Sequence, residues 1–190
     1  MQKIAILFSL VLHPFIVELS TFLFLSLTLT DKNFFIIFLS ITPAFLVLFS
    51  AIYLKYIGQL SDYNGTIRGE RLLLISLGVI YHGLGFLFLQ FFNSPSIIQG
   101  LMFCYSINTA IVWIITTKWK ISIHTIGLGG PLVALWLNGL HYPITMFLLI
   151  ITLCLSRLIL KAHTPMQVAI GTLFSISFAY FQLKYLFLYV

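Results

Sequence analysis

Residues 72–117 read LLLISLGVIYHGLGFLFLQFFNSPSIIQGLMFCYSINTAIVWIITT, and this stretch contains no Asp, Glu, Lys or Arg. It is too long for a single transmembrane helix, which needs about 20 apolar residues, but it fits two such helices. The polar sequence Asn93-Ser94-Pro95-Ser96 in its middle is typical of a turn. The stretch therefore predicts a helical hairpin within a membrane, with helices over 72–92 and 97–117.

The composition of the whole chain supports a membrane protein. Of its 190 residues, 61% are hydrophobic and 7% are charged, whereas soluble domains have roughly 25% charged residues. The formal net charge of +6 would suit a nucleic-acid-binding protein, but the cations lie between long apolar runs and form no patch. With two cysteines and few charges, the chain also lacks the composition of a disordered protein, a coiled coil or a disulfide-rich scaffold. We expect an integral membrane protein and no nucleic-acid partner.

The gaps between charged residues predict the remaining transmembrane segments. Five further apolar runs cover residues 4–30, 33–57, 123–138, 142–160 and 165–189. Because the run over 123–138 is short and contains three glycines and a proline, six spans with a re-entrant or kinked helix are an alternative to seven. The runs lack the alternation of a β-barrel strand. The sequence thus predicts an all-α, polytopic membrane helix bundle of six to seven transmembrane helices, forming a single domain over 1–190.

The charged residues are unevenly divided between the two predicted faces of the membrane. With seven spans, one face would carry Lys3, Lys55, Asp62, Arg68, Glu70, Arg71, Lys118, Lys120, Arg157 and Lys161. The other face would carry only Asp31, Lys32 and Lys184. The positive-inside rule favours a cytoplasmic location for the first face, and we expect the protein in an inner or plasma membrane. The same loops are also able to converge into a site that binds an anion.

Two loops on this face carry the residue types that phosphoryl transfer requires. They are Arg157 and His163 in one loop, and Lys120, Ser122 and His124 in the loop before it. Cations and a hydroxyl hold phosphoryl oxygens, while one imidazole attacks phosphorus and another protonates the leaving oxygen. The sequence has no cluster of carboxylates that would suggest a metal site, so we expect neither a metal nor a cofactor.

This pattern resembles the type 2 phosphatidic acid phosphatases, a family with three short motifs. The third motif is S-R, five residues, H, three residues and D, and it is matched by Ser156, Arg157 and His163, with Gln167 in place of the aspartate. An aspartate there orients the nucleophilic imidazole, and a glutamine is able to accept the same hydrogen bond without supplying charge.

The other two motifs are matched in part. The second motif, P-S-G-H, is matched by Ser122 and His124, with isoleucine in place of both the proline and the glycine. The first motif is K, six residues, R-P, and it is matched by Arg71 alone, because Asn64 replaces the lysine and leucine replaces the proline. The resemblance covers about residues 62–171.

The resemblance implies a metal-independent phosphatase or phosphotransferase that acts on a membrane lipid phosphate or an isoprenoid diphosphate. It implies His163 as the nucleophile that becomes phosphohistidine, and His124 as the acid and base. The residues expected to bind the phosphoryl group are Arg71, Arg157, Ser122 and Lys120, with Gln167 orienting His163. The sequence does not indicate an oligomeric state.

Simpler structural roles remain for several of these residues. Thr164, Pro165 and Gln167 form the pattern of a capping box, so Gln167 has a second role at the start of a helix. Ser122 is suited to cap a helix, and Arg157 to anchor a helix end at the membrane interface. A catalytically degenerate member that acts as a scaffold or lipid-binding subunit is therefore the alternative function. A small transporter using Glu18 and His82 is a third.

Overall fold

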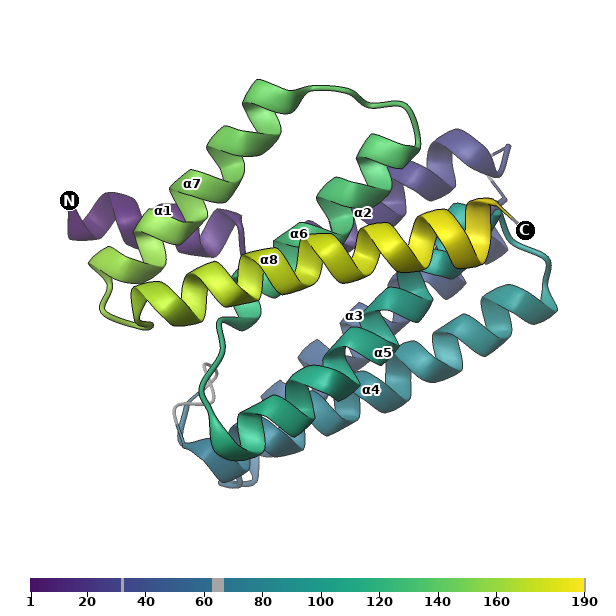
Figure 1. Ribbon diagram of the computed structural model, residues 1–190. Coiled ribbons are helices and arrows are strands. Elements are labelled where there is room, and N and C mark those ends of the chain that lie inside the picture. The colour runs from purple at the N-terminus through teal and green to yellow at the C-terminus, as the bar shows by residue number, and fades with distance from the viewer. Residues whose placement is uncertain (32, 63–66, 190) are drawn as a thin grey trace. The chain divides into compact units, whose positions relative to one another are not determined.

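The computed structural model describes residues 1–31, 33–62 and 67–189, and the regular structure within these ranges is entirely helical. The helices are α1 (Gln2–Val11), α2 (Pro14–Leu29), α3 (Phe34–Tyr56), α4 (Arg68–Phe91), α5 (Ser96–Lys118), α6 (Ile123–Leu137), α7 (Pro143–Ile159), α8 (Pro165–Gln182) and the π-helical segment η1 (Leu183–Leu188) (Figure 1). The predicted all-α class is confirmed, and the predicted apolar segments agree with the helices to within a few residues.

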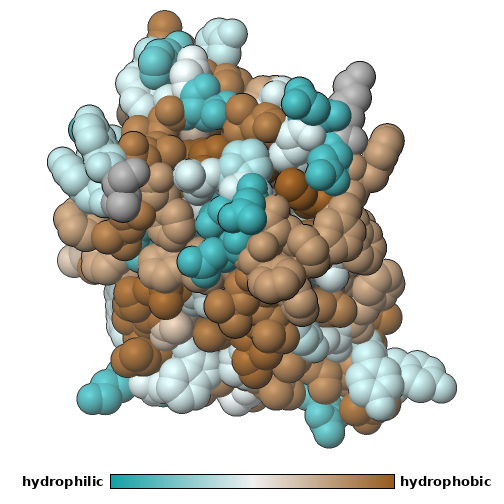
Figure 2. Space-filling model, turned by 90° about the vertical axis from the view of Figure 1, so that its right-hand side faces the viewer, coloured by the Kyte–Doolittle hydropathy of each residue, from teal (hydrophilic) through white to brown (hydrophobic). Residues whose placement is uncertain are grey.

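Five helical segments of the described chain are long and apolar enough to cross a membrane. They are Gln2–Leu29, Phe34–Tyr56, Arg68–Phe91, Ser96–Lys118 and Pro165–Leu188. Helices α6 and α7 are apolar but have only 15 and 17 residues, fewer than the roughly 20 that a perpendicular span needs. Hydrophobic side chains dominate the surface seen in Figure 2. The chain is thus a polytopic helical membrane protein.

The first apolar segment contains a break that the charge pattern does not show. Helix α1 ends at Val11 and α2 begins at Pro14, with Leu12 and His13 between them. Proline has no backbone N–H and clashes with the preceding turn of a helix, but it is favourable at the first position of a new one. Pro14 therefore accounts for the interruption between the two helices.

The chain divides into two compact units. The first comprises Met1–Thr21 and Lys120–Val190, and the second comprises Phe22–Trp119. In the second unit, α4 packs against both α3 and α5, which confirms the hairpin predicted over 72–117. In the first unit, α6 packs along α8, and α1 lies beside α7 (Figure 1). The single domain expected from the sequence stays a prediction.

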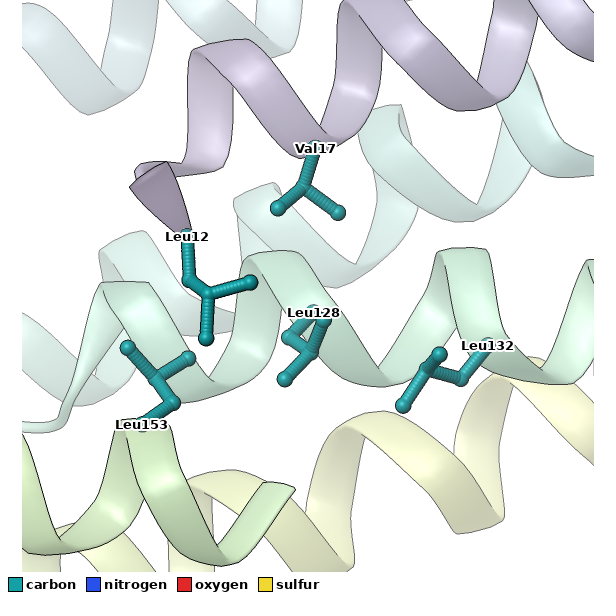
Figure 3. Close-up of a cluster of buried hydrophobic side chains, with 5 residues drawn as sticks. All are labelled: Leu12, Val17, Leu128, Leu132 and Leu153. Atoms are coloured by element: carbon teal, nitrogen blue, oxygen red, sulfur yellow. The ribbon is translucent and has the colours of Figure 1, made fainter. Parts of the chain in front are cut away.

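A cluster of aliphatic side chains holds the break between α1 and α2 in place within the first unit. Figure 3 shows Leu12 and Val17 from this segment facing Leu128 and Leu132 of α6, with Leu153 of α7 beside Leu12. These side chains are all at least nine-tenths buried, and van der Waals packing of this kind stabilises contacts between helices in a membrane. The cluster therefore fixes His13, which adjoins Leu12, relative to α6 and α7.

Two glycines allow the helices of the first unit to approach closely. A Cβ atom added at Gly127 of α6 would lie 2.9 Å from Cβ of Pro14. A Cβ atom added at Gly171 of α8 would lie 2.6 Å from Oγ1 of Thr125 and 3.2 Å from the carbonyl oxygen of Ser122. The start of α6 is thus held between the start of α2 and the first half of α8.

Candidate functional site

The corner between α7 and α8 places the third motif. Helix α7 ends in a Schellman motif, in which N–H of Lys161 donates to the carbonyl of Leu158 and N–H of Ala162 donates to that of Arg157. Lys161 occupies the left-handed position of this motif, with φ +51°. Glycine or asparagine usually occupies this position because other side chains clash there. The tight corner brings the two ends of the motif, Arg157 and His163, to the same region of the first unit.

Helix α8 begins immediately after His163 with a complete capping box. Oγ1 of Thr164 accepts the backbone N–H of Gln167 at 3.3 Å, and Oε1 of Gln167 accepts the backbone N–H of Thr164 at 3.2 Å. Pro165 occupies the first helical position. The helix-starting role considered for Gln167 is therefore confirmed.

Gln167 also contacts the imidazole of His163, as the resemblance leads one to expect. Its Oε1 lies 3.1 Å from Nδ1 of His163. Because the backbone N–H of Thr164 is able only to donate, the atom that faces it must be the amide oxygen, which also accepts a hydrogen bond from Nδ1–H of His163. In its neutral form, the His163 ring thus holds its proton on Nδ1 and its lone pair on Nε2. This is the tautomer that a nucleophilic histidine requires.

An open pocket of about 570 Å³ lies over this corner. It is lined by Lys120, Leu158, Lys161, Ala162, His163, Thr164, Pro165 and Gln167. None of the described residues that line it is acidic, and two of them are lysines. The pocket therefore offers a positively charged surface next to the His163 imidazole, which suits an anionic group.

Arg157 lies on the last turn of α7 and is held by the N-terminal helix. Its Nη1 donates to Oγ of Ser9 in α1 at 2.6 Å. Its Nε atom is buried and has no hydrogen-bond partner among the residues that the structure describes. A buried donor of this kind is satisfied when an anion binds beside it.

His124 lies on the first turn of α6, against His13. The two rings meet edge to face, with centroids 5.1 Å apart and planes at 87°. The His124 imidazole also interacts electrostatically with Arg157 and with His163. His124 is thus within electrostatic range of both Arg157 and His163, and these three residues of the first unit form one group, of which only His163 lines the pocket.

The serines of the second and third motifs make local hydrogen bonds in their own helices. Ser122 is fully buried and is the N-cap residue of α6, with Oγ 3.5 Å from the backbone N of Thr125. Ser156 is also buried, and its hydroxyl donates to the carbonyl of Leu153 within α7. Neither lines the pocket around His163. The capping role considered for Ser122 is the one that the structure shows.

The first motif belongs to the second unit. Arg71 lies in the first turn of α4, where it is buried and interacts electrostatically with Asp62 and Arg68. It is not among the residues that the first unit brings together around His163. Asn64, which replaces the lysine of this motif, lies outside the residues that the structure describes.

Two members of the group, Ser9 and His13, were not predicted from the sequence. Both lie in the apolar run over 4–30, for which the sequence predicts one continuous span and indicates no role for His13. The dipeptide His13-Pro14 was the available signal, because a residue before proline is disfavoured in a helix. The contacts of Ser9 with α7 and of His13 with α6, in contrast, depend on packing between segments more than 100 residues apart.

No protein-family model, curated protein or solved structure matches the chain. Among the residues that the structure describes, no three His, Cys, Asp or Glu side chains are grouped as metal ligands.

Proposed function

We propose that the protein is a membrane-embedded, metal-independent phosphatase or phosphotransferase that acts on a lipid phosphate or an isoprenoid diphosphate through a phosphohistidine at His163. The observation that carries the proposal is the hydrogen bond from Nδ1 of His163 to Oε1 of Gln167, which leaves the ring lone pair on Nε2. The resemblance of Ser156, Arg157 and His163 to the third motif of the type 2 phosphatidic acid phosphatases supports the same assignment.

In the first half of the reaction, Nε2 of His163 attacks phosphorus, and the bond from phosphorus to the leaving oxygen breaks. Burial and the charge of Arg157 lower the pKa of His124, so this imidazole takes up its proton from solvent when the anionic substrate binds. His124 then gives that proton to the leaving oxygen, so the alcohol or the shorter phosphate leaves. Arg157 and the pocket residues Lys120 and Lys161 offset the charge of the transferred group, and Oε1 of Gln167 accepts the hydrogen bond that Nδ1–H of the charged ring donates.

In the second half, His124 takes a proton from water, or from a lipid hydroxyl if the enzyme is a phosphotransferase. The resulting oxygen nucleophile attacks phosphorus, the bond to Nε2 of His163 breaks, and phosphate or a new phosphate ester is released. His163 and His124 then return to their starting protonation states.

The setting of the site favours a lipid substrate. The site belongs to a unit built of apolar helices, and many large hydrophobic side chains are exposed on them. A phosphate ester with an acyl or prenyl tail keeps that tail in the bilayer while its head group reaches the lysines of the pocket. We propose an inner-membrane or plasma-membrane location, with this site on the cytoplasmic side that the positive-inside rule favours.

Phosphate release by the purified protein in lipid nanodiscs tests this proposal. The substrates are phosphatidic acid, phosphatidylglycerol phosphate, lysophosphatidic acid and a prenyl diphosphate, each in excess EDTA. We expect turnover by the wild type, none by His163→Ala, and normal turnover by the control His141→Ala. His141 is exposed and packs on Trp136, before the start of α7, and about 25 Å of helix separates it from the corner that carries His163. Equal turnover by His163→Ala and the wild type would refute the proposal.

A non-catalytic scaffold or lipid-binding subunit is the second candidate function. Two observations favour it: Gln167 has a structural role in the capping box, and Ser122 is buried as a cap. A folded wild type that binds phosphatidic acid in nanodiscs but releases no phosphate from any substrate would support this function.

A further inference from the structure

The N-terminal helices contribute two polar side chains to the group around Arg157. Ser9 in α1 is buried, with 7% of its surface exposed, and its hydroxyl accepts a hydrogen bond from Nη1 of Arg157 at 2.6 Å. This bond joins residues 148 positions apart in the sequence. It also occupies one end of the guanidinium and leaves the buried Nε as a donor.

His13 is the second of these two polar side chains, and it lies beside His124 as Ser9 lies beside Arg157. The two imidazoles are in edge-to-face contact, and Arg157 interacts electrostatically with both. Edge-to-face packing of aromatic rings restricts the rotation of each ring. The orientation of His124 therefore depends on His13.

The position of His13 is itself fixed at three points. Its Nδ1 lies 3.3 Å from the backbone N of Phe15 and accepts that N–H, so the side chain caps α2. The following residue, Pro14, contacts Gly127 of α6 so closely that no Cβ fits there. The preceding residue, Leu12, lies in the aliphatic cluster (Figure 3). A side chain held in this way is suited to position another.

We propose that Ser9 and His13 are positioning residues of the phosphoryl-transfer site, so that the break between α1 and α2 is a functional part of it. Ser9 holds the Arg157 guanidinium where it meets the phosphoryl group, and His13 holds the His124 imidazole where it meets the leaving oxygen. This inference rests on the proposed function and adds the N-terminal segment, which carries none of the three family-like motifs.

The role of His13 predicts a dependence on the leaving group. An alkyl phosphate releases a strongly basic alkoxide, which must be protonated as it departs, whereas p-nitrophenyl phosphate releases a phenolate that departs without a proton. A residue that positions the proton donor therefore affects the first substrate and spares the second. A residue that only stabilises the fold affects both equally.

The variant His13→Asn separates the two roles of His13. Asparagine is among the best N-cap residues, so it retains an acceptor for the N–H of Phe15 while it removes the ring that contacts His124. We expect kcat/KM for a short-chain alkyl phosphate to fall at least about tenfold, and that for p-nitrophenyl phosphate to stay within about threefold of the wild type. The ratio kcat/KM is used because it reports the step in which the leaving group departs, and not the later hydrolysis. Equal losses on the two substrates, or no loss, would overturn the assignment of His13.

Ser9 is tested by phosphate binding, with a conservative variant as the control. We expect Ser9→Ala to weaken competitive inhibition by inorganic phosphate about tenfold, and Ser9→Thr, which retains a hydroxyl, to restore it. Inhibition that is unchanged in Ser9→Ala would overturn the assignment of Ser9.

The same preparations distinguish a failure of this inference from a failure of the proposed function. If the wild type turns over substrate and the Ser9 and His13 variants have the same kinetics and phosphate inhibition as the wild type, the inference is refuted and the proposed function stands. Without wild-type turnover on any substrate, the proposed function fails and with it the role of His13. Inorganic phosphate added during thermal unfolding then decides the role of Ser9. A stabilising shift in the wild type and Ser9→Thr that is absent in Ser9→Ala supports it, and identical behaviour in all three refutes it.

Discussion

Oε1 of Gln167 lies 3.1 Å from Nδ1 of His163 while it accepts the backbone N–H of Thr164 at 3.2 Å. One amide oxygen thus both starts α8 and sets the tautomer of the imidazole. The two roles were separate hypotheses from the sequence, and the geometry shows that they are compatible. Because the capping box holds the amide, the orientation of His163 does not depend on a freely rotating side chain.

Substitution of Gln167 is expected to change the rate in either direction, depending on the replacement. Gln167→Glu keeps the capping box and adds a negative charge next to the imidazole that becomes positive during phosphorylation, so kcat should rise about tenfold. Gln167→Met has similar length but accepts no strong hydrogen bond, so kcat should fall at least about tenfold and the free energy of unfolding by about 1 kcal/mol. Phosphate release and thermal unfolding measure the two effects, and a fully active Gln167→Met would contradict this role.

Lys161 is expected to show opposite effects on stability and on substrate binding. Its backbone lies in the left-handed region, with φ +51°, at a position that favours glycine. Lys161→Gly should therefore raise the free energy of unfolding by about 1 kcal/mol, while KM for an anionic substrate rises because the pocket loses a cation.

The control for Lys161 is Gly139, which follows α6 at φ +93°. Nothing lies within 4 Å of a Cβ atom added there, so Gly139→Ala tests backbone conformation alone and should lower stability without a change in KM. A loss of stability in Lys161→Gly, measured by the unfolding temperature in the same detergent, would contradict the explanation.

Gly171→Ala is expected to disturb the site through helix packing. The added Cβ would meet Oγ1 of Thr125 at 2.6 Å and the Ser122 carbonyl oxygen at 3.2 Å, so α8 must move away from α6. We expect a loss of about 1–3 kcal/mol in stability and a fall in kcat, because His163 and His124 lie at the starts of these two helices. Gly69→Ala in α4 is the matched control, since its Cβ meets nothing within 4 Å. Equal unfolding temperatures for Gly171→Ala and Gly69→Ala would contradict the close approach of α8 to α6 at Gly171.

Ser122→Ala distinguishes a helix cap from a phosphate ligand. Because Ser122 is fully buried and caps α6, its removal should lower the free energy of unfolding by about 0.5–2 kcal/mol. The inhibition constant for inorganic phosphate, measured at a temperature where the variant is folded, should be unchanged. A large increase in that constant would instead assign Ser122 to the phosphate, as the resemblance implies.

The helices were predictable because a membrane imposes a simple rule on the sequence. Backbone groups in the bilayer must be satisfied within each helix, so charge-free runs of sufficient length become helices. The turn after Phe91 and the start of α8 at Pro165 follow from local chemistry that is legible in the sequence. The break at Pro14 was equally legible but was missed, because hydropathy does not change across it.

The candidate site was predictable only where it is local. The contact of Gln167 with His163 spans four residues, and the spacing of the third motif revealed it. The contacts of Ser9 with Arg157 and of His13 with His124 join distant segments. They depend on small residues such as Gly127 and on an aliphatic cluster, whose partners no local pattern specifies.

The most direct test of the account is the isolation of the covalent intermediate. Protein in nanodiscs that contain ³²P-labelled phosphatidic acid or prenyl diphosphate is quenched in alkali, in which phosphohistidine is stable, and the labelled peptide is sequenced. The account predicts a label on His163 in the wild type and in the control His141→Ala, stable in alkali and lost in acid, and no label in His163→Ala. Phosphate release without a label on His163, or a label that persists in His163→Ala, would contradict it.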